Sequence, residues 1–268
     1  PTNAVLGFMN MLMKALEEWP SEGLGIFFDV KGPTKRHELF ENYKEGRKPT
    51  PESFKVQLPL IVELCRLMGM PVFMREGVEA DDCIVSTAAA GARGGWGVRI
   101  LSADKDLFQV INGDIEVIRP SRGVTDFSLY DEENFKEKYG FEPPLMADYL
   151  ALVGDAVDNI PGVPGIGDKT AAKLLQAYGN LEGIYEHVDD LKGKQKEKIV
   201  DNKDMAFLSR DVATIVRDLD FPLDLEACSF PSFDSEKVTE AFKGVQFNAL
   251  FDEPEHSPFR YLSSFDTL

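Results

Sequence analysis

The chain has 268 residues, which is long enough to bury a large hydrophobic core in one big domain or two smaller ones. Its 46 acidic and 29 basic residues give a net charge of −17, which argues against a protein that coats nucleic acid by bulk electrostatic attraction. No apolar run approaches the ~18 residues of a membrane span, so we expect no membrane partner. The three cysteines are widely spaced without a CxxC pair, which favours reduced thiols in a cytosolic protein over disulfides or a zinc site.

Strands and helices alternate in the first half of the sequence. Alternation of this kind predicts a mostly parallel sheet in a three-layer α/β fold. In chain order the apolar spacing predicts a helix over residues 5–19, a strand over 24–28, a basic connection over 31–51, a helix over 54–68, a strand over 71–74, a helix over 79–91, a strand over 98–101, a helical turn over 107–111 and a strand over 115–118.

The strand signals fade after about residue 140, and the rest of the sequence looks helical. We therefore predict two domains, 1–140 and 141–268. In the second, Pro143 and Pro144 start a helix that runs to residue 153, a glycine-rich turn follows, and another helix covers residues 171–175. A last amphipathic helix is predicted around Val238, Phe242 and Val245.

Acidic side chains follow the predicted strands of the first half. A single acid at such a place could be a helix cap or a solvated charge, but ligands of open α/β sheets bind outside the carboxyl ends of the strands. Crowded carboxylates require a cation, and with no histidine or cysteine nearby an all-oxygen site suits Mg²⁺ or Mn²⁺. Two such ions ~4 Å apart can cleave a phosphodiester. The six acids are Asp29, Glu79, Asp81, Asp82, Asp104 and Asp106.

Two further acids, Asp155 and Asp158, precede a turn that almost spells a nucleotide-binding P-loop, GVPGIGDKT, in which Asp168 interrupts the Gly-Lys-Thr. Acids at positions i and i+3 on a helix end point the same way, so we expect these two to complete the metal site. The turn from 162 to 167 is either a plain helix-helix connection or a seat for a phosphate on its backbone N–H groups.

Two stretches of the acidic chain are locally basic. One is the connection 31–51, where basic residues alternate with Phe40 and Tyr43. Each stretch is either a solvated surface or a contact for nucleic acid. The second stretch consists of Lys192, Lys194, Lys196 and Lys198.

Four stretches carry a resemblance to a known family: FFDVKGPTKRHELFENYKEGR, GVEADD, LSADKDLFQ and DYLALVGDAVDNIPGVPGIGDKTAAKLL. In this order they resemble the 5′-nuclease domain of bacterial DNA polymerase I, a member of the flap endonuclease family. The resemblance implies a PIN-like (resolvase-like) α/β domain followed by a helical region that contains a helix-hairpin-helix. It also identifies the connection 31–51 as the arch beside which a single-stranded 5′ end passes.

The resemblance implies a divalent-metal-dependent 5′-3′ exonuclease and 5′-flap endonuclease of DNA replication and repair. Its partners would be flapped, branched or nicked DNA and a polymerase domain in the parent chain, in a monomer of the bacterial cytoplasm and nucleoid or of an organelle of bacterial origin. Two Mg²⁺ or Mn²⁺ ions would be the cofactors, with K⁺ at the hairpin. The implied metal ligands are Asp29, Glu79, Asp81, Asp82, Asp104, Asp106, Asp155 and Asp158, the implied catalytic residues are Lys44 and Arg47, and the implied DNA contacts are Arg36, Gly162, Gly165, Gly167, Lys169 and Thr170.

One departure from the family affects catalysis. The family begins with a strand that carries an Asp-Gly pair, and this sequence starts after it, either because it is cropped or because the protein lacks the strand. In the second case the chain would be a catalytically impaired module that binds DNA junctions. A small-molecule phosphatase or an RNA-cleaving relative is a further alternative, against which the duplex-gripping hairpin argues.

Overall fold

A computed structural model describes residues 2–122, 126–219 and 228, and the helix predicted around Val238 lies outside them. No helix of this part is both long and apolar enough to cross a membrane. The elements are α1 Asn3–Glu18, β1 Ile26–Phe28, α2 Lys35–Leu39, α3 Glu52–Lys55, α4 Leu58–Leu67, β2 Val72–Met74, α5 Ala80–Arg93, β3 Val98–Leu101, η1 Asp106–Val110, β4 Ile115–Arg122, β5 Asp126–Tyr130, α6 Glu132–Tyr139, η2 Pro143–Leu145, α7 Met146–Val153, α8 Asp168–Tyr178, α9 Leu181–Glu186, η3 Val188–Asp190, α10 Gly193–Asp201 and α11 Lys203–Ala213.

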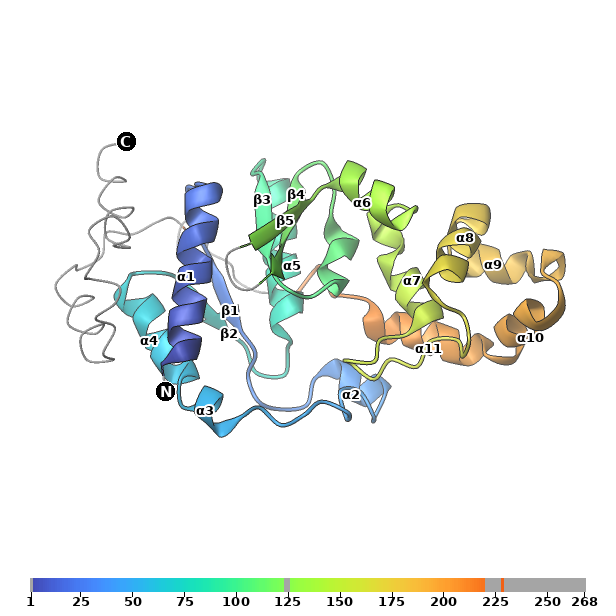
Figure 1. Cartoon of the computed structure of the whole chain (residues 1–268), viewed down its shortest axis with the longest axis horizontal. Coiled ribbons are helices and arrows are strands. Elements are labelled where there is room, and N and C mark those ends of the chain that lie inside the picture. Colours follow the sequence, from blue (N-terminus) through green and yellow to red (C-terminus); the bar gives the residue numbers. More distant parts are fainter. Residues whose placement is uncertain (1, 123–125, 220–227, 229–268) are drawn as a thin grey trace.

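The strands form two small sheets. β1 pairs with β2 in parallel, β3 pairs with β4 in parallel, and β5 pairs antiparallel to β4. The four predicted strands and their parallel pairing are confirmed, whereas β5 was not predicted. Within the described residues no backbone pairing joins the two sheets, and α5 packs against both β1 and β3 (Figure 1).

Helix α5 can pack against both sheets because its sequence favours a helix with one buried face. Glu79 occupies the N-cap position in an extended backbone conformation, and two acids lie in the first turn, where the helix dipole favours negative charge. Small and apolar residues give it a closely packing face. The buried residues of this helix are Asp82, Cys83, Val85, Ser86, Ala88 and Gly91.

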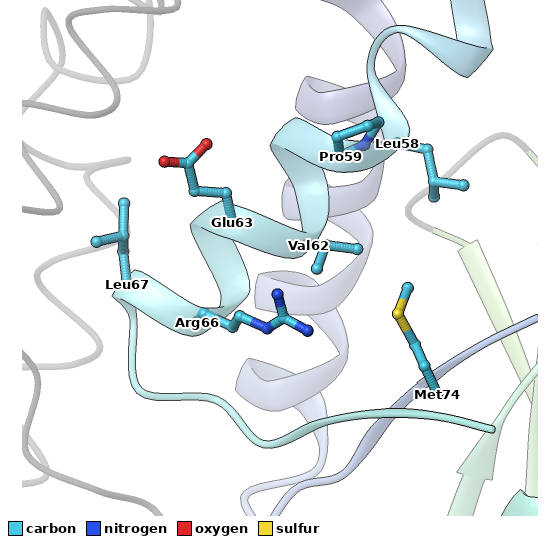
Figure 2. A pocket seen from close by; sticks show the side chains of 7 residues that line it. All are labelled: Leu58, Pro59, Val62, Glu63, Arg66, Leu67 and Met74. Carbon is cyan, nitrogen blue, oxygen red and sulfur yellow. The ribbon is translucent and has the colours of Figure 1, made fainter. Parts of the chain in front are cut away.

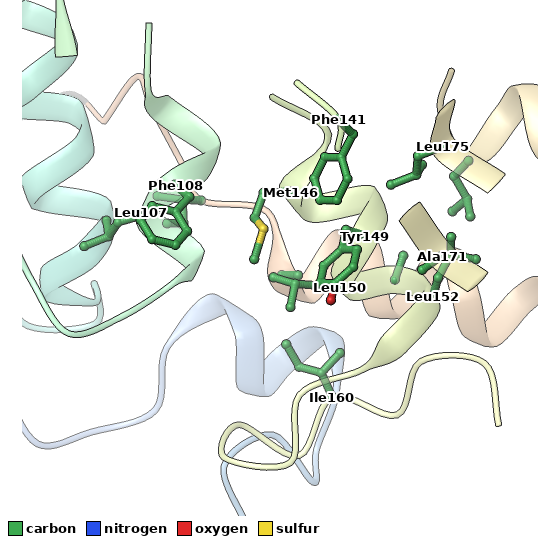
Figure 3. Packing of buried hydrophobic residues seen from close by; sticks show 14 of the residues in the cluster. Leu107, Phe108, Phe141, Met146, Tyr149, Leu150, Leu152, Ile160, Ala171 and Leu175 are labelled. Atoms are coloured by element: carbon green, nitrogen blue, oxygen red, sulfur yellow. The ribbon is translucent and has the colours of Figure 1, made fainter. Parts of the chain in front are cut away.

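The hydrophobic side chains form two clusters. The smaller cluster joins α1, α4 and β1 and includes Val5, Met9 and Cys65. Beside it, α4 and Met74 line an apolar pocket of about 630 Å³ (Figure 2). The larger cluster runs from η1 through α7 into α8, as Figure 3 shows for Phe108 and its neighbours. This cluster continues across residue 140, so the domain boundary placed there stays a prediction.

The two acids after α7 do not lie on a helix, so that prediction was wrong. Helix α7 ends at Val153, and Gly154 follows with φ +75°. The Oδ1 atom of Asp155 accepts the backbone N–H of Val157 at 2.6 Å and that of Asp158 at 3.2 Å. A short acidic side chain that bonds to the backbone ahead of it competes with helix formation and creates a turn instead.

Buried side chains and backbone hydrogen bonds hold the glycine-rich turn before α8 in place. Val163 and Ile166 are buried, and the N–H of Val163 donates to the carbonyl of Leu152 at 2.9 Å. The N–H of Gly162 donates to the hydroxyl of Ser209 on α11 at 3.1 Å. We call this turn the hairpin (residues 162–167). These contacts fix its buried side, and the rest of its backbone lies at the surface.

Gly162 should tolerate no side chain. Its φ is +63°, and a Cβ there would lie 2.3 Å from the backbone nitrogen of Gly154, so Gly162→Ala should lower the free energy of unfolding in urea by about 2–4 kcal/mol. The control Gly167→Ala has open space around its Cβ and an extended φ of −106°, so it should change stability by less than about 0.5 kcal/mol. Equal losses in the two variants would contradict the proposed steric cause.

Candidate metal and nucleic-acid site

The acids predicted from the strand ends gather along one edge of the molecule. Asp29 follows β1, and its Oδ1 accepts the N–H of Ala80 at the start of α5 at 2.8 Å. Asp104 and Asp106 follow β3, and Asp104 accepts the N–H of Asp106 at 2.9 Å. Asp81, on the first turn of α5, lies near enough to Asp104 and Asp29 for both charges to raise its pKa. The structure thus brings acids from three segments together.

Two of these acids hold protons unusually tightly. Burial raises the pKa of Asp81 to about 7, and the charges of Asp104 and Asp29 add to the effect. Burial also raises the pKa of Asp106 well above its usual range, helped by Asp104 and Asp155. The Oδ1 atom of Asp106 is buried without a hydrogen-bond partner, which is costly for a carboxylate oxygen.

Glu79 stays ionised because basic groups surround it. It is 5% exposed, and its carboxylate accepts hydrogen bonds from the Thr34 hydroxyl at 2.9 Å and from Lys44 Nζ at 2.8 Å. The Arg36 guanidinium lies 3.3 Å away. Burial alone would raise the pKa of Glu79, but Arg36 and Lys44 outweigh it and lower the pKa.

The turn after α7 brings two more paired acids to the same edge. Asp155 forms an ion pair with Lys105 at 2.8 Å, which lowers the pKa of Asp155 against the effect of burial. Asp158, 6% exposed, accepts a hydrogen bond from Arg47 and one from the Tyr43 hydroxyl at 3.2 Å. The charges of both acids raise the pKa of Asp106, so the turn and the loop after β3 face each other.

The arch is docked onto this turn by its backbone as well. The N–H of Lys44 donates to the carbonyl of Asp158 at 2.9 Å, and the Asn159 side chain donates to the carbonyl of Asn42 at 2.7 Å. Lys44 has φ +61° and Asn159 has φ +57°, a left-handed conformation that is uncommon outside glycine and occurs often at functional sites.

The carboxylates and the basic side chains alternate in space. In the part of the chain that the structure describes, no three acidic, histidine or cysteine side chains converge at the spacing of a metal-binding group. Lys44, Arg47 and Lys105 stand between the acids. Asp81, Asp104 and Asp106 form no ion pair among the described residues, although Lys44 and Lys105 lie near enough to lower the pKa of Asp81 and of Asp106, respectively, against the effect of burial. The buried oxygen of Asp106 is of the kind that a hard divalent cation would satisfy. The donor set therefore fits Mg²⁺ or Mn²⁺ in its chemistry.

Asp82 and Arg36 form a buried pair. The Nη1 and Nη2 atoms of Arg36 donate to the two carboxylate oxygens of Asp82 at 2.8 and 2.7 Å, and Arg36 is only 7% exposed. Arg36 also donates to the carbonyls of Val212 and Thr214 at the end of α11. This geometry favours a structural role for both, and the metal contact predicted for Asp82 and the DNA contact predicted for Arg36 stay predictions.

The residues of the hairpin and of the start of α8 that were predicted to contact DNA lie at the surface, except for Gly162. Gly165, Gly167 and Lys169 are exposed, and Thr170 is half-buried. The N–H groups of Gly165 and Gly167 donate to no acceptor within the described chain. Gly162 is buried and bonded to Ser209, so it shapes the turn.

Three side chains at the site were not assigned a role from the sequence. Tyr43 donates its hydroxyl toward Glu79 and Asp158, Thr34 donates to Glu79, and Lys105 pairs with Asp155. In the sequence, Tyr43 directly precedes the predicted Lys44, and Lys105 lies between two predicted acids. Their positions next to predicted site residues could therefore have identified Tyr43 and Lys105.

The crowding of Asp81 by other acids should lower the free energy of unfolding when Asp81 is ionised. Because its pKa is raised to about 7 in the folded state, unfolding releases its proton between about pH 4 and pH 7, so ionised Asp81 destabilises the fold above this window. In EDTA near pH 8, Asp81→Asn should raise the free energy of unfolding by about 1–3 kcal/mol, and the gain should vanish near pH 4. Thermal unfolding across pH measures this; the exposed Asp114→Asn is the control, and a gain independent of pH would refute the electrostatic cause.

Loss of the buried arginine should be severe. Arg36→Met leaves Asp82 and Glu79 buried with fewer partners, and should lower the free energy of unfolding in urea by about 3–5 kcal/mol. Arg99→Met is the control, because Arg99 is 45% exposed and pairs with Glu116 at the surface, where a pair contributes about 0–1 kcal/mol. If Arg36→Met cost no more than the control, the pair would not be structural.

Known proteins are similar to this chain in fold and in sequence. Residues 1–140 match the 5′-3′ exonuclease N-terminal resolvase-like domain, and residues 141–236 match the 5′-3′ exonuclease C-terminal SAM fold. Among solved structures, T5 5′-exonuclease with bound zinc ions superposes with a TM-score of 0.68 at 20% identity, covering 90% of each chain. The catalytic core of Rad2 in complex with DNA substrate gives 0.60 at 17% identity, covering 90% of this chain and 79% of the other. The predicted fold class is confirmed.

The sequence relatives are longer than this chain. DNA polymerase I of Bacillus caldotenax is 40% identical over 255 residues, which is 95% of this chain and 29% of the polymerase. Thermostable DNA polymerase I of Thermus aquaticus is 42% identical over 254 residues, which is 94% of this chain and 29% of that polymerase. The chain thus spans less than a third of these relatives. By both of its matching segments, it belongs to the 5′-3′ exonuclease family of nucleases.

Proposed function

We propose that this chain hydrolyses DNA phosphodiesters in a divalent-metal-dependent reaction, as a 5′-3′ exonuclease and 5′-flap endonuclease of replication and repair. The observation that carries the proposal is a series of neighbouring acids from four segments: Asp29 and Asp104 act on Asp81, and Asp104, Asp155 and Asp158 act on Asp106, whose buried Oδ1 lacks a partner. Membership of the exonuclease family supports it.

The proposed metal ligands are the acids of this edge. Asp81, Asp104 and Asp106 form no ion pair in the described chain, so they would bind a cation with the smallest rearrangement. When bound, two Mg²⁺ or Mn²⁺ ions would supply a water of lowered pKa and stabilise the leaving oxygen. Asp82, in our proposal, keeps its pairing with Arg36. The remaining ligands would be Asp29, Glu79, Asp155 and Asp158.

The basic side chains of the arch would act on the substrate phosphate. Lys44 and Arg47 already reach the acids, and Arg47 is about two-fifths exposed, so either can turn toward a phosphate that arrives at the edge. A preorganised positive charge next to the scissile phosphate stabilises the charge that develops in the transition state. Tyr43, which is fixed by hydrogen bonds to Glu79 and Asp158, would hold the basic side chains of Lys44 and Arg47 at this position.

The hairpin would hold the duplex beside the cut. The unbonded N–H groups of Gly165 and Gly167 form a phosphate seat at the start of α8, with Lys169 and Thr170 beside them. A K⁺ ion at the hairpin is proposed on the family resemblance alone. T5 flap endonuclease has been solved with DNA and metal ions, and Rad2 with a DNA substrate, which supports DNA as the ligand.

A second candidate is a module that binds DNA junctions without cutting them. The observation that favours it is that no three acids among the described residues converge at metal-binding spacing. In this case the hairpin and the arch would hold DNA while the acids served only to balance Lys44, Arg47 and Lys105.

The proposed setting follows the relatives. Because the matched sequences are parts of DNA polymerase I, we propose that a polymerase domain accompanies this nuclease in the parent chain. We further propose a monomer that works in the bacterial cytoplasm at the nucleoid, or in an organelle of bacterial origin.

Flap cleavage tests the proposed function. A labelled 5′-flap duplex should yield a short product in Mg²⁺ and none in EDTA, and Asp155→Asn should lower the rate by ~100-fold or more, because metal sites respond on this scale to damage of their ligand shell. The control Asp114→Asn removes an exposed acid of the β3–β4 connection and should cleave at the wild-type rate. Wild-type binding to the flap without a product would favour the junction-binding module.

A further inference from the structure

One lysine of the second basic stretch lies on the hairpin. Lys198 of α10 donates a hydrogen bond from Nζ to the carbonyl of Gly165 at 2.9 Å, across 33 positions of sequence. Gly165 has φ +79°, and a Cβ there would lie 2.3 Å from Nζ and 2.9 Å from Cε of Lys198. The lysine side chain thus occupies the space over the glycine, and the surface of the hairpin includes a residue of another helix.

The charge of Lys198 is not neutralised by an acid. Among the described residues, Lys198 forms no ion pair, and the carbonyl of Gly165 takes one of its three N–H groups. Lys196, two positions earlier on the same helix, is different: it pairs with Asp189 at 2.7 Å and lowers the pKa of that acid. Residues two apart on a helix do not face the same way, so only one of these charges is turned to the hairpin.

The surroundings of Lys198 suit a phosphate. The N–H groups of Gly165 and Gly167 donate to no acceptor in the described chain. The acid that directly follows the hairpin, Asp168, accepts a hydrogen bond from the Tyr149 hydroxyl at 2.8 Å. A phosphate seated on the two glycines would therefore meet the remaining N–H groups of the Lys198 ammonium.

We propose that Lys198 is a further DNA contact, which joins α10 to the hairpin so that both grip one backbone phosphate of the duplex. The hairpin would supply neutral N–H donors, which fix position, and Lys198 the full charge, which supplies affinity that depends on salt. The proposal rests on the proposed function in that the substrate is duplex DNA, and it requires no cleavage.

The salt dependence of binding tests the contact. Fluorescence anisotropy would follow binding of the wild type, Lys198→Met, Lys198→Arg and Lys196→Met to a labelled blunt duplex in EDTA at several KCl concentrations. Removal of one phosphate contact lowers the slope of log affinity against log salt by about 0.9. We expect this fall for Lys198→Met, little change for Lys196→Met, and the wild-type slope for Lys198→Arg. Unchanged melting temperatures would show that the half-buried position tolerates methionine.

Each of the other possible results would refute either the Lys198 contact or the nuclease function. A wild-type slope for Lys198→Met, or equal falls for Lys198→Met and Lys196→Met, would refute the contact, since the second result reports only net charge. If wild type binds the duplex, Lys198→Met shows the expected fall, and the Mg²⁺ flap assay yields no product, then the contact stands and the nuclease function fails. If wild type does not bind the duplex, the Lys198 contact is refuted, and the Mg²⁺ flap assay decides the nuclease function independently.

Discussion

The structure depends on the burial of negative charge at the start of α5. Glu79 and Asp82 are 5% exposed, and a carboxylate withdrawn this far from water needs a cation with suitable geometry. Arg36 contacts both acids and donates to the carbonyls of Val212 and Thr214. One guanidinium therefore joins the first turn of the arch, the helix that spans both sheets and the end of the last described helix.

The same constraint divides the remaining acids into two groups. Asp155 and Asp158 have basic partners from the loop after β3 and from the arch, and these pairs hold the facing loops together. Asp81 and Asp106 form no ion pair in the described chain, and burial raises their pKa. The acids with partners shape the edge of the molecule, while those without partners are the groups that a metal cation would stabilise most.

The sequence was informative where structure is local. Strands with an acid at the end were predicted because alternation and burial are short-range patterns, and the antiparallel β5 was missed because it depends on pairing with β4. Asp81 and Asp82 are adjacent in the sequence, which does not reveal that their side chains have different neighbours. In the structure Asp81 lies near Asp104, whereas Asp82 pairs with Arg36. Arg36 looked exposed within a basic stretch, since its partners on α11 are 176 positions away. The turn at Asp155 replaced a predicted helix because its own side chain bonds to the backbone.

The division into two sheets has a consequence for the acidic edge. α1, α4 and β1 have a hydrophobic cluster of their own, and within the described chain their strands share no backbone pairing with β3. The smaller unit is joined to the rest through α5, which packs against both β1 and β3. Asp29 stands at the end of β1 and accepts the N–H of Ala80 on α5, so the hydrogen bond that joins the smaller sheet to this helix also positions the acid near Asp81. The folding of one sheet thereby becomes coupled to the electrostatics of the acidic edge.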